Sequence, residues 1–280
     1  MSQRTESFFL APQNSRLFYQ CWEVPQPKAH LVITHGQGEH SGCYERVAQA
    51  LGDLSVNIYA WDLRGHGRSQ GPRGYARHFH DYVQDFQSFL QHLKTEKNLY
   101  PKDLILLSHS MGGLIQLMTL LDNPHWIFRA QVLSSPMLGV ALQVPLVKDI
   151  AALVLANLWP QLTLHNEIEI TDLSRDPNVL KEFDLDVLRH HRISSSVYLG
   201  AVTSIEVLRH KMDQIKIPTL WQIPEKDPVV GSENSRAMFR QLGSAAKTLC
   251  QYTNRQHEIY NDLGREEVYQ DLRNFLTNLK

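Results

Sequence analysis

The stretch LILLSHSMGG, residues 104–113, carries an apolar run that stops at a serine, and two glycines follow a few residues later. A short apolar run bounded by turn residues is typical of a buried strand. The residues from Gly112 onward have helical spacing, so the sequence predicts a strand, a sharp turn and a helix. In that setting the central residue, Ser110, is pushed above the edge of a sheet in a strained conformation.

Small residues are required two positions before and two positions after such a serine, because the strand and the helix nearly touch. Gly112 meets this requirement, but Ser108 replaces the first glycine of the usual G-x-S-x-G pattern. We expect the turn to tolerate a serine there, with some added strain. The alternative interpretation is an ordinary strand-to-helix turn in which Ser110 caps the helix, since a short motif is only a hypothesis.

Strand and helix patterns alternate on both sides of this turn. This alternation predicts an α/β protein with a mostly parallel sheet that helices cover on both faces. It breaks between residues 137 and 212, where the pattern is mainly helical. We therefore expect a core made of residues 1–136 and 213–280, with 137–212 as a helical cap over the carboxyl edge of the sheet. The strand-like runs are 17–24, 30–34, 56–61, 104–107, 130–133, 219–223 and 248–252.

A serine becomes a nucleophile when a base accepts its proton and an acid orients that base. In this architecture the acid and the histidine follow the serine in chain order. Asp227 and His257 each lie just after one of the last two strand-like runs, and Glu225 is a rival for the acid. Because these positions follow strand ends, we expect them at the same edge of the sheet as Ser110.

Such a reaction also requires backbone N–H donors for a transient oxyanion. One donor is expected from Met111, which directly follows the serine. The loop within LVITHGQGEHSG, residues 31–42, offers a second: Gly36 and Gly38 allow close approach, and Gln37 N–H is the expected donor. The alternative interpretation of this loop is a glycine-rich turn that leads into the next helix.

Composition excludes several other classes of protein. The chain has 280 residues and a formal net charge of −1, so it has no broad basic field for nucleic acid. There are 14 histidines, but neither CxxC nor HExxH occurs, and the sequence predicts no metal site. The odd set of three dispersed cysteines and the lack of a signal-peptide pattern predict a cytoplasmic protein.

Several segments together resemble a known family. They are HGQGEHSGCY (35–44), WDLRGHGRS (61–69), SHSMGG (108–113), LSRDP (173–177) and the late aspartate and histidine. Over nearly its whole length the chain resembles the monoacylglycerol lipase and lysophospholipase group of serine hydrolases, which has the α/β-hydrolase fold. HGxGEHS is the most specific of these motifs. The resemblance implies Ser110 as nucleophile, Asp227 as orienting acid, His257 as general base, and Gln37 and Met111 as oxyanion donors.

The resemblance also implies three substrate-binding positions. Glu39 of the HGxGEHS motif would lie near the glycerol-like leaving group, and a carboxylate that only holds the turn is an equal alternative. His109 occupies a position that the family also gives to histidine. Phe183 stands where relatives often have a tyrosine, and Cys43 where they often have an arginine that pairs with the glutamate. Both departures put a strict preference for glycerol in doubt.

The implied reaction is hydrolysis of the ester of a single-chain glycerolipid, a monoacylglycerol or a lysophospholipid, through an acyl-enzyme on Ser110 and without a cofactor. The alternatives are a general carboxylesterase for short soluble esters and a non-catalytic binding protein with the same fold.

Two segments of the predicted cap bear on the partners. PLVKDIAALVLANLWPQL, residues 145–162, is apolar around most of its helical circumference. One interpretation is that its free side faces an acyl tunnel or makes transient contact with a membrane surface. The alternative is that it is fully packed between neighbouring elements of the cap or in a dimer. The charged LRHHR, residues 188–192, is either a contact for a phosphate head group or a solvated helix face.

Overall fold

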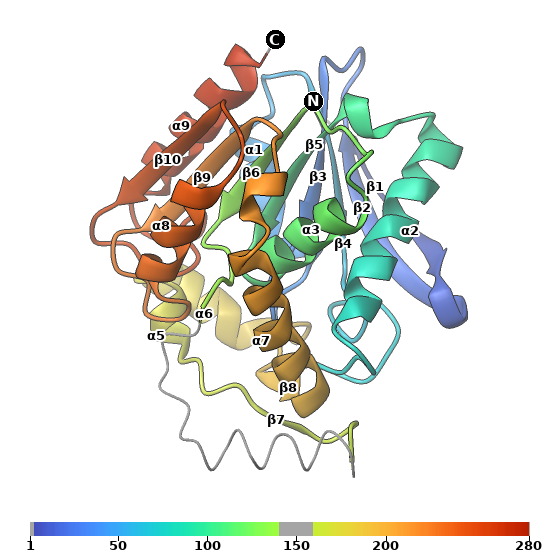
Figure 1. Cartoon of the computed structure of the whole chain (residues 1–280), viewed down its shortest axis with the longest axis vertical. Coiled ribbons are helices and arrows are strands. Elements are labelled where there is room, and N and C mark those ends of the chain that lie inside the picture. Colours follow the sequence, from blue (N-terminus) through green and yellow to red (C-terminus); the bar gives the residue numbers. More distant parts are fainter. Residues whose placement is uncertain (1–2, 140–158, 280) are drawn as a thin grey trace.

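The computed structural model of the chain describes residues 3–139 and 159–279. Eight strands form one sheet in the order β1-β2-β4-β3-β5-β6-β9-β10 (Figure 1). The first two strands and the β2–β4 pair are antiparallel, and all pairs from β4 to β10 are parallel. The strands are β1 (Gln3–Ala11), β2 (Ser15–Glu23), β3 (Ala29–Thr34), β4 (Val56–Trp61), β5 (Leu104–His109), β6 (Ala130–Ser134), β9 (Thr219–Pro224) and β10 (Lys247–Tyr252). The mostly parallel sheet is confirmed.

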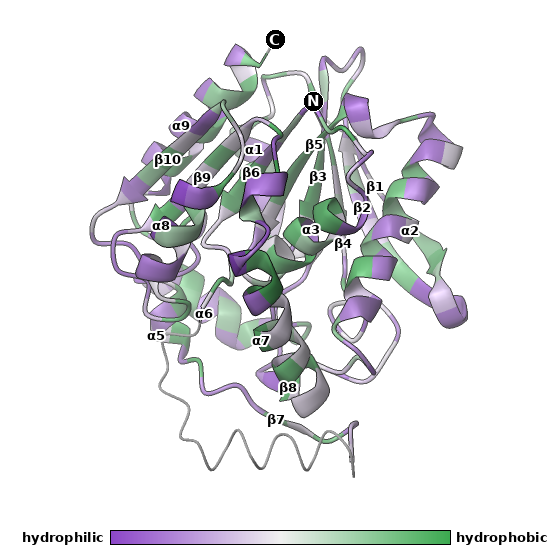
Figure 2. Cartoon of the chain, in the orientation of Figure 1, coloured by the Kyte–Doolittle hydropathy of each residue, from purple (hydrophilic) through white to green (hydrophobic). Residues whose placement is uncertain are grey.

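Helices cover both faces of this sheet. α1 (Glu45–Ala50) and α9 (Arg265–Asn278) pack on one face, and α2 (His80–Lys97), α3 (Met111–Asp122) and α8 (Ser232–Gln241) pack on the other. The central strands are hydrophobic along most of their length, whereas the helices carry hydrophilic residues as well (Figure 2). Burial on both faces explains why these strands read as continuous apolar runs. Short 3₁₀ turns are η1 (Pro12–Asn14), η2 (Ser41–Tyr44), η3 (Pro101–Asp103) and η4 (Met212–Gln214).

β1 is a strand that the hydrophobic pattern did not predict. Its first five residues, QRTES, are all exposed, so the stretch has little apolar periodicity. Backbone pairing with β2 holds it at the edge of the sheet, from Gln3 opposite Glu23 to Ala11 opposite Ser15. An edge strand of this kind depends on its neighbour for hydrogen bonds, which local sequence does not record.

The described residues between β6 and β9 form three helices and a small two-stranded sheet. The helices are α5 (Ile170–Leu173), α6 (Pro177–Leu185) and α7 (Ser195–Arg209), and the antiparallel strands are β7 (Thr163–His165) and β8 (Arg192–Ser194). The two strands were not predicted. α5 and α6 lie beyond the lower end of the sheet in Figure 1. The boundaries at 137 and 212 stay a prediction, and the apolar segment 145–162 lies mostly outside the described residues.

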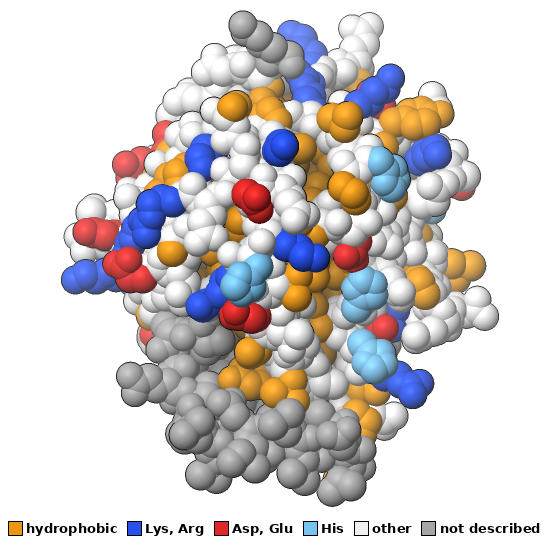
Figure 3. Space-filling model, in the orientation of Figure 1, with side chains coloured by type: hydrophobic (Ala, Val, Ile, Leu, Met, Phe, Trp, Pro, Cys, Tyr) orange, Lys and Arg blue, Asp and Glu red, His pale blue; other side chains and the backbone are white. Residues whose placement is uncertain are grey.

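Two surface properties bear on possible partners. None of the helices within residues 3–139 and 159–279 combines the length and the hydropathy that crossing a bilayer requires. On the face drawn in Figure 3, basic and acidic side chains are interspersed rather than gathered into separate fields. This mixture agrees with the small net charge of the chain.

Candidate active site

Ser110 lies at the turn between β5 and α3. Its backbone has φ 50° and ψ −120°, a conformation that residues other than glycine rarely adopt. The N–H of Ser110 donates to the carbonyl of Ser134 at 3.0 Å, and its own carbonyl accepts from the N–H groups of Gly113 and Met137, each at 2.9 Å. Neighbouring strands and the first turn of the helix therefore hold the strained residue. The strand, turn and helix predicted from residues 104–113 are confirmed.

Gly112 lies where α3 passes closest to the end of β3. A Cβ atom at this position would stand 2.3 Å from the carbonyl oxygen of Thr34 and 2.5 Å from that of His35. Backbone atoms cannot give way by that much, so only glycine fits. The requirement for a small residue after the serine is thus a consequence of backbone contact.

Ser108, the departure from the usual motif, is fully buried in β5, where it pairs with Thr34 and Leu133 of the adjacent strands. Its hydroxyl has no hydrogen-bond partner among the residues that the structure describes. A buried, unpaired polar group costs about 1–3 kcal/mol. We therefore expect Ser108→Ala to leave the free energy of unfolding unchanged or to raise it by about 1 kcal/mol, as measured by urea denaturation.

Ser174 provides the matched control for that measurement. It is equally buried, but its hydroxyl donates to the carbonyl of Asn261 at 3.0 Å and accepts from the N–H of Asp176 at 3.1 Å. Ser174→Ala is expected to lower the free energy of unfolding by about 1–3 kcal/mol, because both partners lose a bond. An equal loss in the two variants would contradict the prediction for Ser108.

The structure brings three of the predicted site residues into one hydrogen-bonded series. His257 Nε2 lies 2.9 Å from Ser110 Oγ, and His257 Nδ1 lies 2.8 and 3.0 Å from the carboxylate oxygens of Asp227. Asp227 Oδ1 also accepts from the N–H groups of Val229 at 2.9 Å and Val230 at 3.1 Å. The acid is therefore fixed by its own loop while it orients the imidazole.

The electrostatics of this series raise the pKa of the histidine and lower that of the acid. Burial lowers the pKa of His257, but the Asp227 carboxylate outweighs it, with help from Glu258 and Glu39, so the pKa is raised above its ordinary value. For Asp227, burial acts to raise the pKa. The contacts with His257 and two backbone amides outweigh this effect and hold the pKa below its usual range. Glu225, the rival acid, is exposed and is not the carboxylate in contact with the imidazole.

Both expected oxyanion donors belong to segments that border Ser110. A Cβ atom on Gly36 would stand 3.0 Å from Ser110 Cβ, so the loop that carries Gln37 touches the serine. Met111 is the first residue of α3, and its N–H therefore has no acceptor within the helix. The amides of Gln37 and Met111 stay predictions as oxyanion donors.

Glu39 is buried in the loop after β3. Its Oε1 accepts from the N–H of Gly36 at 2.5 Å and from the hydroxyl of Tyr44 at 3.0 Å. Burial, together with the carboxylate of Glu258, raises the pKa of Glu39 to about 7. The bond to Gly36 is the one that a turn-holding carboxylate would make, and contact with a leaving group stays a prediction.

His109 and Phe183 are the other two positions predicted to bind the substrate. The His109 ring centre is 4.7 Å from that of His257, and burial with that neighbour lowers the pKa of His109 to about 3. Its imidazole is therefore neutral. Phe183, on α6, lines a narrow crevice of about 30 Å³ together with Gln37 and Arg189. The substrate contacts assigned to both residues stay predictions.

Comparison with known proteins shows the family to which this chain belongs. A family model described as serine aminopeptidase, S33, matches residues 25–264. The chain belongs to this family. The monoacylglycerol lipase of Mycolicibacterium smegmatis is 28% identical over 279 residues, with 99% of this chain and 98% of the relative covered. Human monoglyceride lipase is 31% identical over 252 residues, with 88% of this chain and 81% of the relative covered.

A solved structure agrees with these relatives. The crystal structure of Paleococcus ferrophilus monoacylglycerol lipase matches with a TM-score of 0.85 and 29% identity, and the match covers 94% of this chain and 99% of that one. This chain is a serine hydrolase with the α/β-hydrolase fold and a carboxylic ester hydrolase, as the motifs predicted. The alternative of a non-catalytic binding protein is therefore set aside.

Arg189, whose side chain is nearly buried, is a residue of this hydrolase's site that sequence patterns did not reveal. Its guanidinium donates to both carboxylate oxygens of Glu258 at 2.9 Å and lies 4.0 Å from Glu39 Oε2. The interpretation of residues 188–192 as a solvated helix face was wrong, because 188–191 form no helix and lie between α6 and β8, and Arg192 is the first residue of β8. No spacing in the sequence relates Arg189 to Glu258, which lies 69 positions further along the chain.

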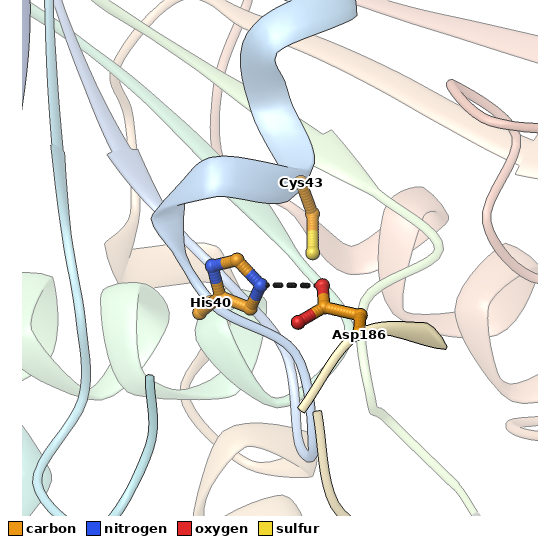
Figure 4. Close-up of side chains that lie close together, drawn as sticks. All are labelled: His40, Cys43 and Asp186. Carbon is orange, nitrogen blue, oxygen red and sulfur yellow. Dashed lines mark hydrogen bonds and ion pairs between the residues drawn. The ribbon is translucent and has the colours of Figure 1, made fainter. Parts of the chain in front are cut away.

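His40, Cys43 and Asp186 form the one cluster of possible metal ligands among the described residues, with ligand atoms within 4.8 Å of one another (Figure 4). His40 Nε2 lies 2.8 Å from Asp186 Oδ2, while its Nδ1 accepts from the N–H of Gly42 at 3.1 Å. A histidine that binds a metal through Nε2 normally carries a proton on Nδ1. That proton would face the Gly42 N–H, so the cluster does not suit a metal. The contact between His40 and Asp186 instead connects the loop after β3 to the segment that follows α6.

Proposed function

We propose that this hydrolase cleaves the ester of a single-chain glycerolipid, with a monoacylglycerol as its preferred substrate, through an acyl-enzyme on Ser110. The observation that carries this proposal is the continuous hydrogen-bond series from Asp227 through His257 to Ser110. Such a series is the requirement for an activated serine. The similarity to monoacylglycerol lipases supports a glyceride as the substrate.

The proposed reaction has two steps. His257 accepts the proton of Ser110 as the serine attacks the ester carbonyl, and Asp227 stabilises the resulting imidazolium. The amides of Gln37 and Met111 bind the oxyanion, and the alcohol departs with the proton from His257. Water then attacks the acyl-enzyme with the same base, and the fatty acid is released.

A neutral head group is supported by the charges around the crevice beside Gln37. Arg189 lines that crevice, but its guanidinium is already paired with both oxygens of Glu258, and Glu39 Oε2 lies 4.0 Å away. A phosphate would have to compete with the buried Glu258 carboxylate for this cation. It would also lose its own hydration on entering the crevice, a larger cost than that of burying a neutral glycerol hydroxyl. We therefore place monoacylglycerol ahead of lysophospholipid. Membrane contact through residues 145–162 stays a prediction, and most of that segment lies outside the described residues.

The raised pKa of His257 predicts where activity is lost in acid. A protonated Nε2 cannot accept the proton of Ser110, so cleavage falls as the pH drops through the pKa of His257. Because that pKa is raised, we expect the acid limb of kcat/KM to lie above the ordinary imidazole value of 6.5. Initial rates on a soluble ester between about pH 5 and 9 would measure this limb. A midpoint below the ordinary imidazole range would contradict the assigned environment of the base.

Fatty-acid release from a monoacylglycerol and a lysophosphatidylcholine of equal acyl length tests the substrate class, with Ser110→Ala as the blank. We expect the higher kcat/KM for the monoacylglycerol. A higher value for the lysophospholipid would overturn the proposed head-group preference. A short soluble ester belongs in the same series, because a rate that falls as the acyl chain lengthens would favour the general carboxylesterase.

A further inference from the structure

The chain that joins α6 to β8 runs against the loop that carries the expected oxyanion donor. We call residues 186–192 the bridging segment, residues 35–39 the oxyanion loop and residues 253–262 the histidine loop. The N–H of His190 donates to the carbonyl of Gly38 at 3.0 Å, and Gln37 Nε2 donates to the carbonyl of Arg192 at 2.6 Å. A Cβ atom on Gly38 would stand 2.4 Å from the His190 carbonyl oxygen, so the two backbones are in direct contact.

Arg189 is the member of the bridging segment that reaches both loops. Glu258 adjoins His257 in the histidine loop and receives the guanidinium at 2.9 Å through both of its oxygens. Glu39 of the oxyanion loop presents Oε2 to the same guanidinium at 4.0 Å, while its Oε1 accepts from the N–H of Gly36. One cation thus lies between two carboxylates that belong to the two loops.

The surroundings fix the orientation of this guanidinium. It stacks over the ring of Phe183 at 3.6 Å, and the side chain of Arg189 is only 9% exposed. Glu258 is held from a further direction by Asn261 Nδ2, which donates to its Oε2 at 2.9 Å. A planar guanidinium can satisfy such a fixed pair of carboxylate oxygens, whereas a lysine ammonium would act only as a point charge.

We propose that Arg189 is a positioning residue for ester cleavage. By binding Glu258 and Glu39 together, it holds the histidine loop and the oxyanion loop at the spacing that lets the base and the oxyanion donor meet the same carbonyl. The inference rests on the proposed function and deepens it, because it assigns part of the active site to a segment outside the sheet. Arg189 acts through these carboxylates and does not touch the reacting atoms.

The loss of this cation has a second, electrostatic consequence. Without Arg189 the carboxylate of Glu258 would remain unneutralised next to His257, and negative charge there raises the pKa of the imidazole. The acid limb of activity would then move to higher pH. The titratable groups that face His257 are Asp227, His109, Glu258 and Glu39.

The test compares Arg189→Met, Arg189→Lys and Arg209→Met in the full chain. We expect Arg189→Met to lower kcat/KM by about a hundredfold, as misplacement of reacting groups does, and to move the acid limb upward. Arg189→Lys should lose less activity than Arg189→Met. Its acid limb should stay at the pH of the wild type, because the positive charge is kept. Arg209 is exposed on α7, and within residues 3–139 and 159–279 its ion pair is with Glu206 of its own helix, so its variant should match the wild type.

The charge argument has its own check in Glu258→Gln. Alone, this variant should move the acid limb to lower pH, and combined with Arg189→Met it should bring the limb back toward that of the wild type. A folded Arg189→Met variant with wild-type kcat/KM and an unmoved limb would overturn the proposal. If that variant does not fold, wild-type kcat/KM in Arg189→Lys would overturn it instead. Failure of the proposed function would be a separate result: Ser110→Ala would keep its activity, both with Arg189 and with its variants.

Discussion

Ser110→Ala is expected to lower the rate of ester cleavage by about a millionfold, the scale of loss when a serine nucleophile is removed. The hydroxyl lies 2.9 Å from His257 Nε2, so its removal leaves the base without a nucleophile to activate. The backbone of residue 110 is held by bonds to Ser134, Gly113 and Met137 that do not involve its side chain. The variant should therefore keep its fold and its thermal midpoint, and only turnover should disappear.

Fatty-acid release and labelling by a fluorophosphonate measure this loss independently. Ser88→Ala is a suitable control, because this partly exposed serine on α2 donates to the carbonyl of Gln84 in its own helix. The control should be labelled and should turn over like the wild type. Retention of a measurable fraction of the wild-type rate in Ser110→Ala would end the assignment of this residue as nucleophile.

Asp227→Asn is expected to lower kcat by about ten-thousandfold, with much smaller effects on stability. The asparagine amide can donate to His257 Nδ1, which would favour the tautomer with its proton on Nε2 and prevent that nitrogen from accepting from Ser110. The amide oxygen can still accept from the N–H groups of Val229 and Val230, which now bind Asp227 Oδ1. The loop should therefore stay in place while catalysis fails.

Glu225→Gln is the matched control for the acid, since Glu225 was the rival on sequence grounds and is exposed in the structure. Steady-state kinetics on one soluble ester would compare the two variants. We expect Glu225→Gln to keep the kcat of the wild type. A large loss in that variant and a small loss in Asp227→Asn would transfer the role of the orienting acid to Glu225.

Local sequence predicted the parts of the site that depend on nearby residues. The turn at Ser110 follows from the apolar run of β5 and from Gly112, and both features lie within ten residues. Asp227 and His257 could be found because they follow strand ends, and parallel strands bring their carboxyl ends to one edge of a sheet.

Features that depend on contacts between distant segments could not be predicted in the same way. β1 is mostly exposed and is defined by its pairing with β2, so it has no hydrophobic period of its own. Arg189 meets Glu258 across 69 positions of sequence, and the pattern LRHHR is equally compatible with a solvated surface. A buried ion pair of this kind becomes visible only when the segment between α6 and β8 is placed against both loops.

The central claim, an acyl-enzyme on Ser110, can be tested by mass spectrometry of the protein quenched with acid during turnover of an activated ester. We predict a mass increase equal to one acyl group, on the peptide that contains residues 104–113, and no such increase in Ser110→Ala. An acyl group found on a different residue, or continued turnover with no covalent adduct in the wild type under conditions that trap acyl-enzymes, would contradict the account.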